Sequence, residues 1–304
     1  MPATILHIGT PRTGTTVIQK HLLPKCRRSF IVSKRAYSSS GNIRDNQKPL
    51  IGYTTKEEIR QSLQANKPEE INSTKHFINN IMTPLVQISR GERDKEVEHL
   101  ICLAVKQLIQ VANNNNLLLS SERICDCSAS LRGDSQHTQS DEEFLVHALS
   151  RVCTKANGQT PLISICFREA ISYLRSKYIR TAILRHQGKL KKISPKEYIQ
   201  KQATLESDHP GTSALTPAMH AEFIKQLQQH AFVKAFGFQE LLASDDVFSL
   251  MGLPGEDKYA FRDFPRENKL PFTKEQEQAI EIEITEALKQ YGFYDQIMKA
   301  QMFE

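Results

Sequence analysis

Residues 4–24 read TILHIGTPRTGTTVIQKHLLP. Residues 4–8 are apolar and partly β-branched, which predicts a short buried strand. Residues 9–14 are rich in Gly, Pro and Thr and predict a turn, and a helical pattern of apolar residues then continues until Pro24 stops it. A strand, a glycine-bearing turn and a helix N-terminus together make an anion site, because free backbone N–H groups converge there with the positive end of the helix dipole.

The spacing of the glycines narrows the choice of anion. Gly9 and Gly14 are separated as in a P-loop, but a nucleoside-triphosphatase loop continues with Lys and then Ser or Thr. In this chain Thr15 occupies the lysine position, and the basic residue is Arg12, inside the turn. Without that lysine, triphosphate hydrolysis lacks its main charge clamp. An ordinary ATPase or GTPase is therefore disfavoured.

The segment PRTGTT resembles the 5′-phosphosulfate loop of the sulfotransferases that use 3′-phosphoadenosine 5′-phosphosulfate (PAPS), written Pro-Lys/Arg-Ser/Thr-Gly-Thr-Thr. The resemblance implies a P-loop-like sulfotransferase fold and PAPS as co-substrate, with no metal. It also implies a catalytic role for Arg12, which would stabilise the bridging oxygen as the leaving phosphate gains charge. The residues implied to bind the cofactor here are Pro11, Arg12, Thr13, Gly14, Thr15 and Thr16.

A second match follows the predicted strand over residues 162–167. Arg168 stands at the end of that strand, and Ser176 lies eight residues later in a helical pattern. This arrangement resembles the 3′-phosphate site of the same family. Guanidinium gives bidentate recognition of phosphate oxygens, and a hydroxyl adds a third contact. The alternative is a charge at a helix start and a surface serine.

A third match lies in the loop FPRENKLP over residues 264–271. Many bacterial and carbohydrate-acting members of the family have a similar Arg-x-Asn-x-Ser loop against the cofactor. The resemblance implies that Arg266 and Asn268 bind the cofactor. Leu270 and Pro271 depart from the family pattern, because they stand where a small polar residue is usual.

An acceptor hydroxyl needs a general base. Glu122 follows the apolar run at residues 117–120 and resembles the Ser-Ser-Glu segment of bacterial relatives, which implies that it is the catalytic base. The alternative is a helix-start glutamate neutralised by Arg123. His7 lies within a strand and His21 faces away along the first helix, so we interpret both as structural.

Strands are predicted over 4–8, 117–120, 162–167 and 232–238, and they alternate with helical patterns. Such alternation predicts an α/β protein with a central parallel sheet flanked by helices. We interpret residues 1–304 as a single domain with a helical insert at about 43–112 and a variable substrate or lid region at about 186–215. Residues 25–50 are interpreted as an irregular connection. Further helices are expected from Ser194 (a short one) and over about 143–155, 216–229, 247–253 and 273–290.

Composition limits the partners. The net charge of +6 suits an anionic ligand, but no Lys/Arg block with interleaved aromatics argues for nucleic acid. No apolar run reaches membrane-spanning length, and the early first strand leaves no room for a signal peptide. The six cysteines are scattered and make no Cys-x-x-Cys pair, so we interpret them as reduced thiols in a cytoplasmic protein.

The sequence therefore predicts a PAPS-dependent sulfotransferase that acts on a hydroxyl of a small-molecule or glycan acceptor, such as a carbohydrate or related metabolite. Two other functions stay open. One is a small-molecule or nucleotide kinase with a degenerate loop, which would need Mg²⁺ and ATP. The other is a non-catalytic relative that binds the nucleotide without transferring a group. The sequence does not indicate the oligomeric state.

Overall fold

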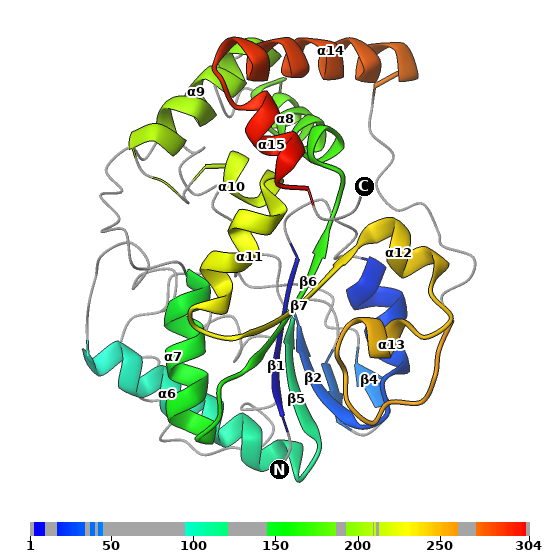
Figure 1. Cartoon of the computed structure of the whole chain (residues 1–304). Helices are drawn as coiled ribbons and strands as arrows, with labels where there is room; N and C mark the ends of the chain where they lie inside the picture. The colour runs from blue at the N-terminus through cyan, green and yellow to red at the C-terminus, as the bar shows by residue number, and fades with distance from the viewer. Residues whose placement is uncertain are drawn as a thin grey trace.

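Strand β1 (Thr4–Gly9) forms where the sequence predicts it and lies near the middle of the sheet (Figure 1). In the computed structural model the described residues are 3–9, 17–33, 37–39, 42–44, 95–120, 145–186, 193–208, 210, 213–260 and 272–301. The strand order is β4-β3-β2-β5-β1-β6-β7. Five of these strands are mutually parallel: β1 with β2 (Ser29–Ser33), β5 (Asn116–Ser120), β6 (Leu162–Phe167) and β7 (Phe232–Gly237). The predicted parallel sheet is confirmed.

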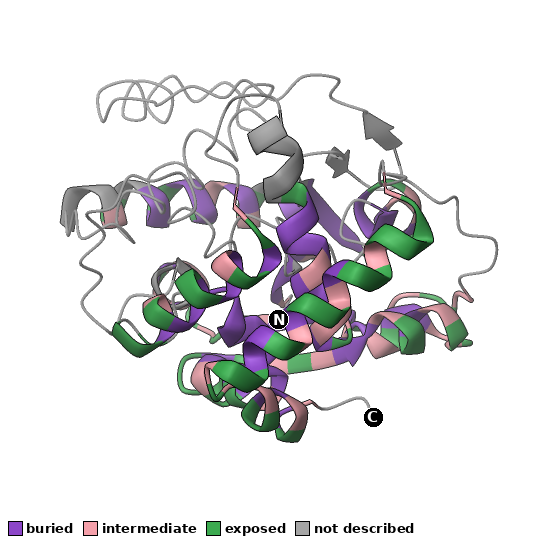
Figure 2. Ribbon diagram, turned by 90° about the horizontal axis from the view of Figure 1, so that it is seen from above, coloured by how far each residue is buried: buried purple, intermediate pink, exposed green. Residues whose placement is uncertain are grey.

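Helices cover both faces of the parallel strands, which explains why those strands are rich in apolar residues. Helices α6 (Lys95–Ala112), α7 (Leu145–Asn157) and α11 (His220–Gln228) share a hydrophobic core with one face. The other face packs against the short turns η1 (Ile18–Leu22) and η2 (Leu23–Lys25) and against α12 (Phe238–Ala243) and α13 (Val247–Leu250). Figure 2 shows the central strands as buried and the outer sides of the helices as exposed, whereas the edge strand β7 has exposed and partly exposed residues.

A second group of helices lies beyond the end of the sheet at which β6 leads into α8 (Figure 1). Their apolar side chains form a separate core that includes Tyr173, Tyr198 and Ile284. Helix α8 is the centre of this group, because its described side chains are buried on most sides. The members are α8 (Ala170–His186), α9 (Pro195–Asp208), α10 (Leu215–Ala218), α14 (Lys274–Gln290) and α15 (Tyr294–Lys299).

The interpretation of residues 25–50 as irregular is wrong where the structure describes them. Strand β2 lies there and pairs with β5, and β3 (Tyr37–Ser39) and β4 (Asn42–Arg44) extend the sheet in antiparallel fashion. Only three consecutive apolar residues, Phe30 to Val32, carry β2, so the local signal is too short to predict it. Pairing with a neighbouring strand supplies the missing stability.

The helix predictions differ from the structure in four places. Helix α9 is a 14-residue helix with buried Tyr198 and Ile199, rather than the short helix expected from Ser194. The helix expected over 216–229 is divided into α10 and α11 at Met219. Helices α12 and α15 were not predicted. The start of α14 is confirmed, because Thr273 caps it by accepting a hydrogen bond from the backbone N–H of Gln276 at 3.3 Å.

Ion pairs of Arg175 on α8 connect this helix to α14. The Arg175 guanidinium lies 3.2 Å from the Glu277 carboxylate and 2.8 Å from that of Glu281, and all three side chains are mostly shielded from solvent. Partly buried charged hydrogen bonds of this kind contribute more to stability than exposed ion pairs do. Arg175 therefore fixes the last long helix against the segment that follows β6.

Replacing Arg175 by Leu is expected to lower the free energy of unfolding by about 2 kcal/mol, because two carboxylates lose a charged donor. Urea denaturation monitored by circular dichroism measures the change. The matched control is Lys201→Ala, whose ion pair with Glu197 is more exposed, with 56% of the lysine side chain accessible. That control should change stability by less than about 0.5 kcal/mol. Equal effects of the two substitutions would contradict the anchoring role.

Candidate functional site

The chain leaves the neighbouring strands β1 and β6 in opposite directions. After β1 it continues to β2, on the β5 side of the sheet, whereas after β6 it continues to β7 on the other side. Such a switch point opens a crevice at the carboxyl ends of the strands, where open α/β sheets bind ligands. Gly9 of β1 is the register partner of Cys166 of β6, so the two strands end side by side. Arg168 follows at that edge.

Arg168 is half-buried directly after the buried Phe167. Burial lowers the pKa of its guanidinium, and the nearby positive charge of Arg175 lowers that pKa further. The carboxylates of Glu169 and Glu277 act in the opposite direction but do not cancel the shift. Arginine still carries its charge at any ordinary pH. The position therefore holds a partly desolvated cation at the carboxyl edge of the sheet.

His220 at the start of α11 supports the backbone at this position. Its ring centroid lies 4.5 Å from that of Phe167, and the residue is only 1% exposed. A hydrogen bond with the Arg168 backbone raises the pKa of His220, but burial outweighs it and lowers the pKa to about 4. The imidazole is therefore neutral near pH 7. Its contacts with Phe167 and with the Arg168 backbone stabilise the chain where β6 ends.

Ser176 lies on α8 and is 4% exposed, and Lys177 beside it is 7% exposed. The alternative interpretation of Ser176 as a surface serine is therefore wrong, because the neighbours of α8 enclose it, whereas its role as a phosphate contact stays a prediction. Arg168 and Ser176 thus belong to the same strand-to-helix segment, at opposite ends of two helical turns. Lys177 adds a buried amine that the sequence motif did not single out.

The N-terminus of α8 already has acceptors. The Glu169 carboxylate accepts hydrogen bonds from the backbone N–H groups of Ile171 and Ser172, each at 2.7 Å. The side-chain oxygen of Gln301 accepts from the N–H of Ala170 at 3.0 Å. These contacts satisfy the helix start. An anion beside Arg168 would therefore be held by side chains rather than by the backbone of α8.

Several predicted site residues lie outside the described residues, and the structure neither unites nor separates them. Strand β1 does lead into the predicted phosphate loop, and β5 ends two residues before Glu122. His7 is buried within β1, and His21 lies on η1 and is partly exposed. The residues outside the description are Pro11, Arg12, Thr13, Gly14, Thr15, Thr16, Glu122, Arg266 and Asn268.

His220, Arg175 and Lys177 were not identified from the sequence. Arg175 and Lys177 lie within the motif segment, but its pattern assigns them no role. His220 lies 52 positions beyond Arg168 in the sequence, and no local pattern connects the two residues. Only the packing of α11 against the end of β6 brings them together.

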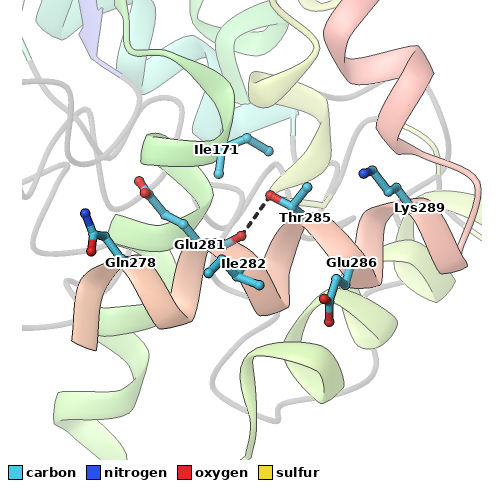
Figure 3. A pocket seen from close by; sticks show the side chains of 7 residues that line it. All are labelled: Ile171, Gln278, Glu281, Ile282, Thr285, Glu286 and Lys289. Atoms are coloured by element: carbon cyan, nitrogen blue, oxygen red, sulfur yellow. Dashed lines mark hydrogen bonds between the residues drawn. The ribbon is translucent and has the colours of Figure 1, made fainter. Parts of the chain in front are cut away.

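A shallow hollow of about 490 Å³ lies on α14 beside Ile171 of α8 (Figure 3). Its remaining lining residues all come from one helix, and one polar group among them is already used, since Thr285 donates to the Glu281 carbonyl at 2.8 Å. Binding sites usually gather polar groups from several elements. The hollow is therefore a weaker candidate than the carboxyl edge of the sheet. Its other lining residues are Gln278, Ile282, Glu286 and Lys289.

None of the described helices has both the length and the apolar character needed to cross a bilayer. Within the same residues, no three His, Cys, Asp or Glu side chains gather as they would around a metal ion. Fold and site together define an α/β protein with a ligand site expected at the switch point of a parallel sheet.

Comparisons with protein-family models, with curated proteins and with solved structures give no match to this chain.

The low pKa of His220 predicts a pH-dependent stability. Its pKa is about 4 in the folded protein and near 6.5 in the unfolded chain, so the unfolded chain binds a proton first as the pH falls. Stability from this residue is present above pH 6.5 and is lost as the pH falls through 4. Between pH 7 and pH 5 His220 should account for a loss of about 2 kcal/mol.

Urea denaturation at both pH values tests this expectation. His220→Phe keeps an aromatic ring against Phe167 and should lose less stability than the wild type between pH 7 and pH 5. Phe223→Leu is the control, because Phe223 contacts the same ring (centroid separation 6.2 Å) but does not titrate. It should lower stability at both pH values equally. An unchanged pH slope in His220→Phe would refute the assignment.

Proposed function

We propose that the protein is a sulfotransferase that moves the sulfonate group of PAPS to an acceptor hydroxyl, on a carbohydrate or a related metabolite. The observation that carries the proposal is the pairing of Gly9 with Cys166 at the switch point. The PRTGTT motif begins two residues after Gly9, and Arg168 stands two residues after Cys166. One motif resembles a binding site for the 5′-phosphate of PAPS and the other a binding site for its 3′-phosphate. The two motifs thus follow the ends of adjacent strands.

Each residue has a proposed role in an in-line displacement. The backbone N–H groups of residues 13–16 would hold the 5′-phosphate, and Arg12 would stabilise its oxygen as the S–O bond breaks and negative charge develops there. Arg168 would neutralise the 3′-phosphate, with Ser176 as a more distant partner. Glu122 would accept the proton of the acceptor hydroxyl as its oxygen bonds to sulfur. Arg266 and Asn268 are proposed as weaker cofactor contacts.

The kinase alternative is less well supported. It requires a Mg²⁺–ATP site, and the lysine that would clamp the phosphates is replaced by Thr15. A relative that only binds the nucleotide would keep the cofactor residues and lose turnover. A preference for Mg²⁺–ATP over adenosine 3′,5′-bisphosphate would distinguish a kinase from the proposed enzyme. The absence of sulfonate transfer would distinguish a relative that only binds the nucleotide.

Calorimetric titration distinguishes the nucleotides. The wild-type protein is expected to bind adenosine 3′,5′-bisphosphate with micromolar affinity and to give no comparable response to Mg²⁺–ATP. Arg168→Gln should weaken binding of the bisphosphate by about 2 kcal/mol, close to thirtyfold in Kd, since a charged hydrogen-bond donor is lost. Binding of adenosine 5′-monophosphate, which lacks the 3′-phosphate, should be unchanged by the same substitution.

The control for this titration is Arg180→Gln, which removes an exposed cation from the same helix. It should leave the affinity for the bisphosphate within about twofold of wild type, as expected for a screened surface charge. Equal losses for both nucleotides in Arg168→Gln would remove this residue from the 3′-phosphate site. Preference for Mg²⁺–ATP in the wild type would favour the kinase alternative.

Glu122→Gln should abolish sulfonate transfer and leave the affinity for adenosine 3′,5′-bisphosphate intact, because the amide cannot accept the hydroxyl proton. Transfer of ³⁵S from labelled PAPS to a panel of carbohydrate and metabolite acceptors provides the measurement. Arg123→Gln is the control, since it removes the charge that would neutralise a merely structural Glu122. A fully active Glu122→Gln variant would exclude this residue as the base.

A further inference from the structure

A row of three fully buried polar residues crosses the middle of the sheet. His7 of β1 is the register partner of Ser120 on β5 and of Ser164 on β6, and all three residues are 0% exposed. Register partners in a parallel sheet direct their side chains to the same face. We call Ser120, His7 and Ser164 the polar row.

The polar row lies on the face that η1 covers. Side chains two positions away along the same strands, Ile5, Leu118 and Cys166, share a hydrophobic core with Ile18 and Leu22 of η1. The row is therefore enclosed between the sheet and the first helical turn, immediately after the chain has passed through residues 10–16.

Hydrogen bonds connect part of this row to η1. The side-chain amide of Gln19, itself 3% exposed, donates to the Ser120 hydroxyl at 3.1 Å and to the Ser120 carbonyl at 3.2 Å. His7 Nδ1 lies 2.7 Å from the same hydroxyl. The Ser120 hydroxyl accepts from Gln19 and also hydrogen-bonds to Nδ1, and the tautomer of His7 sets the direction of that second bond. One chain of contacts thus links η1 to the ends of both β5 and β1.

Ordinary core packing does not explain the polar row. His7 Nε2 and Ser164 Oγ are buried and have no hydrogen-bond partner among the residues that the structure describes. Apolar side chains of similar size would avoid that desolvation penalty. Burial also lowers the pKa of His7 to about 4, so the ring is a neutral hydrogen-bonding group near pH 7. Buried polar residues that break the apolar pattern of a sheet centre are expected at functional sites, and here their contacts with η1 fit a positioning role.

We propose that Ser120, His7 and Gln19 form a positioning network that holds η1 in register with the carboxyl ends of β1 and β5. This inference rests on the proposed function, because what it positions is the nucleotide site at those strand ends. The three residues touch no substrate atom in this scheme. They act by keeping the two described elements that flank residues 10–16 at a fixed separation, so that less conformational freedom is lost when a nucleotide binds.

The polar row supplies its own matched pair of substitutions. Ser120→Ala and Ser164→Ala make the same chemical change at two fully buried positions on either side of His7, but only Ser120 is in the hydrogen-bonded chain. Ser120→Ala should raise the Kd for adenosine 3′,5′-bisphosphate by about tenfold. Ser164→Ala should leave it within about twofold. Ser120→Thr, which keeps the hydroxyl, should restore most of the affinity.

Hydrogen exchange provides a readout that needs no nucleotide. In the unliganded protein, Ser120→Ala should accelerate exchange of the backbone amides of residues 17–22, whereas Ser164→Ala should not. Gln19→Leu is the second variant if Ser120→Ala fails to fold, with the same expected effects. Equal exchange and equal affinity in the two alanine variants would overturn the network. If the wild type binds no bisphosphate, the proposed function fails, and the exchange comparison alone supports or overturns the network.

Discussion

The structure depends on the enclosure of β1. This strand is hydrogen-bonded to β5 on one side and to β6 on the other, and its side chains at Ile5, Leu6 and Ile8 are inaccessible from either face. A slip of one residue would move every side chain of β1 to the opposite face. The register is therefore fixed, and so is the point at which the chain leaves the sheet after Gly9. The ligand site expected at the carboxyl edge starts from that exit point and from the end of β6 beside it.

A helix or strand can be predicted from the sequence when its own residues, rather than distant partners, supply most of its stability. Strands β1, β5, β6 and β7 are mostly apolar, with single interior polar positions at His7, Ser164 and Lys234, and the sequence predicts each of them. Strand β2 has only Phe30 to Val32 as its apolar content, and it exists because β5 offers a partner. The division between α10 and α11 at Met219 leaves no local sign either. Pairing and packing across long sequence distances decide such cases.

In the candidate site, too, some residues are predictable from the local sequence and others depend on contacts between distant segments. Arg168 and Ser176 are recognisable because a strand end and the following helix keep a fixed spacing in the chain. The residues that give Arg168 its environment come from elsewhere: His220 from α11 and Glu277 from α14. A short motif carries no information about them. The burial of Ser176 was also hidden from the sequence, because α8 reads as a helix with several charged positions and its enclosure by α9, α10 and α14 is a tertiary effect.

The charges around α8 give a physical reason to expect an anion near Arg168. Arg175 is balanced by two carboxylates within 3.2 Å, and these contacts fasten α14 to the core. The pKa of the Arg168 guanidinium is lowered by burial and by Arg175, in spite of Glu169 and Glu277. A cation whose pKa is lowered is destabilised by its environment, and negative charge brought beside it relieves that destabilisation. A neutral ligand offers no such relief. The phosphate ligand proposed for this site would therefore gain at this position what a neutral metabolite of the same shape would not, and the gain would depend on the partial exclusion of water that burial beside Phe167 and His220 provides.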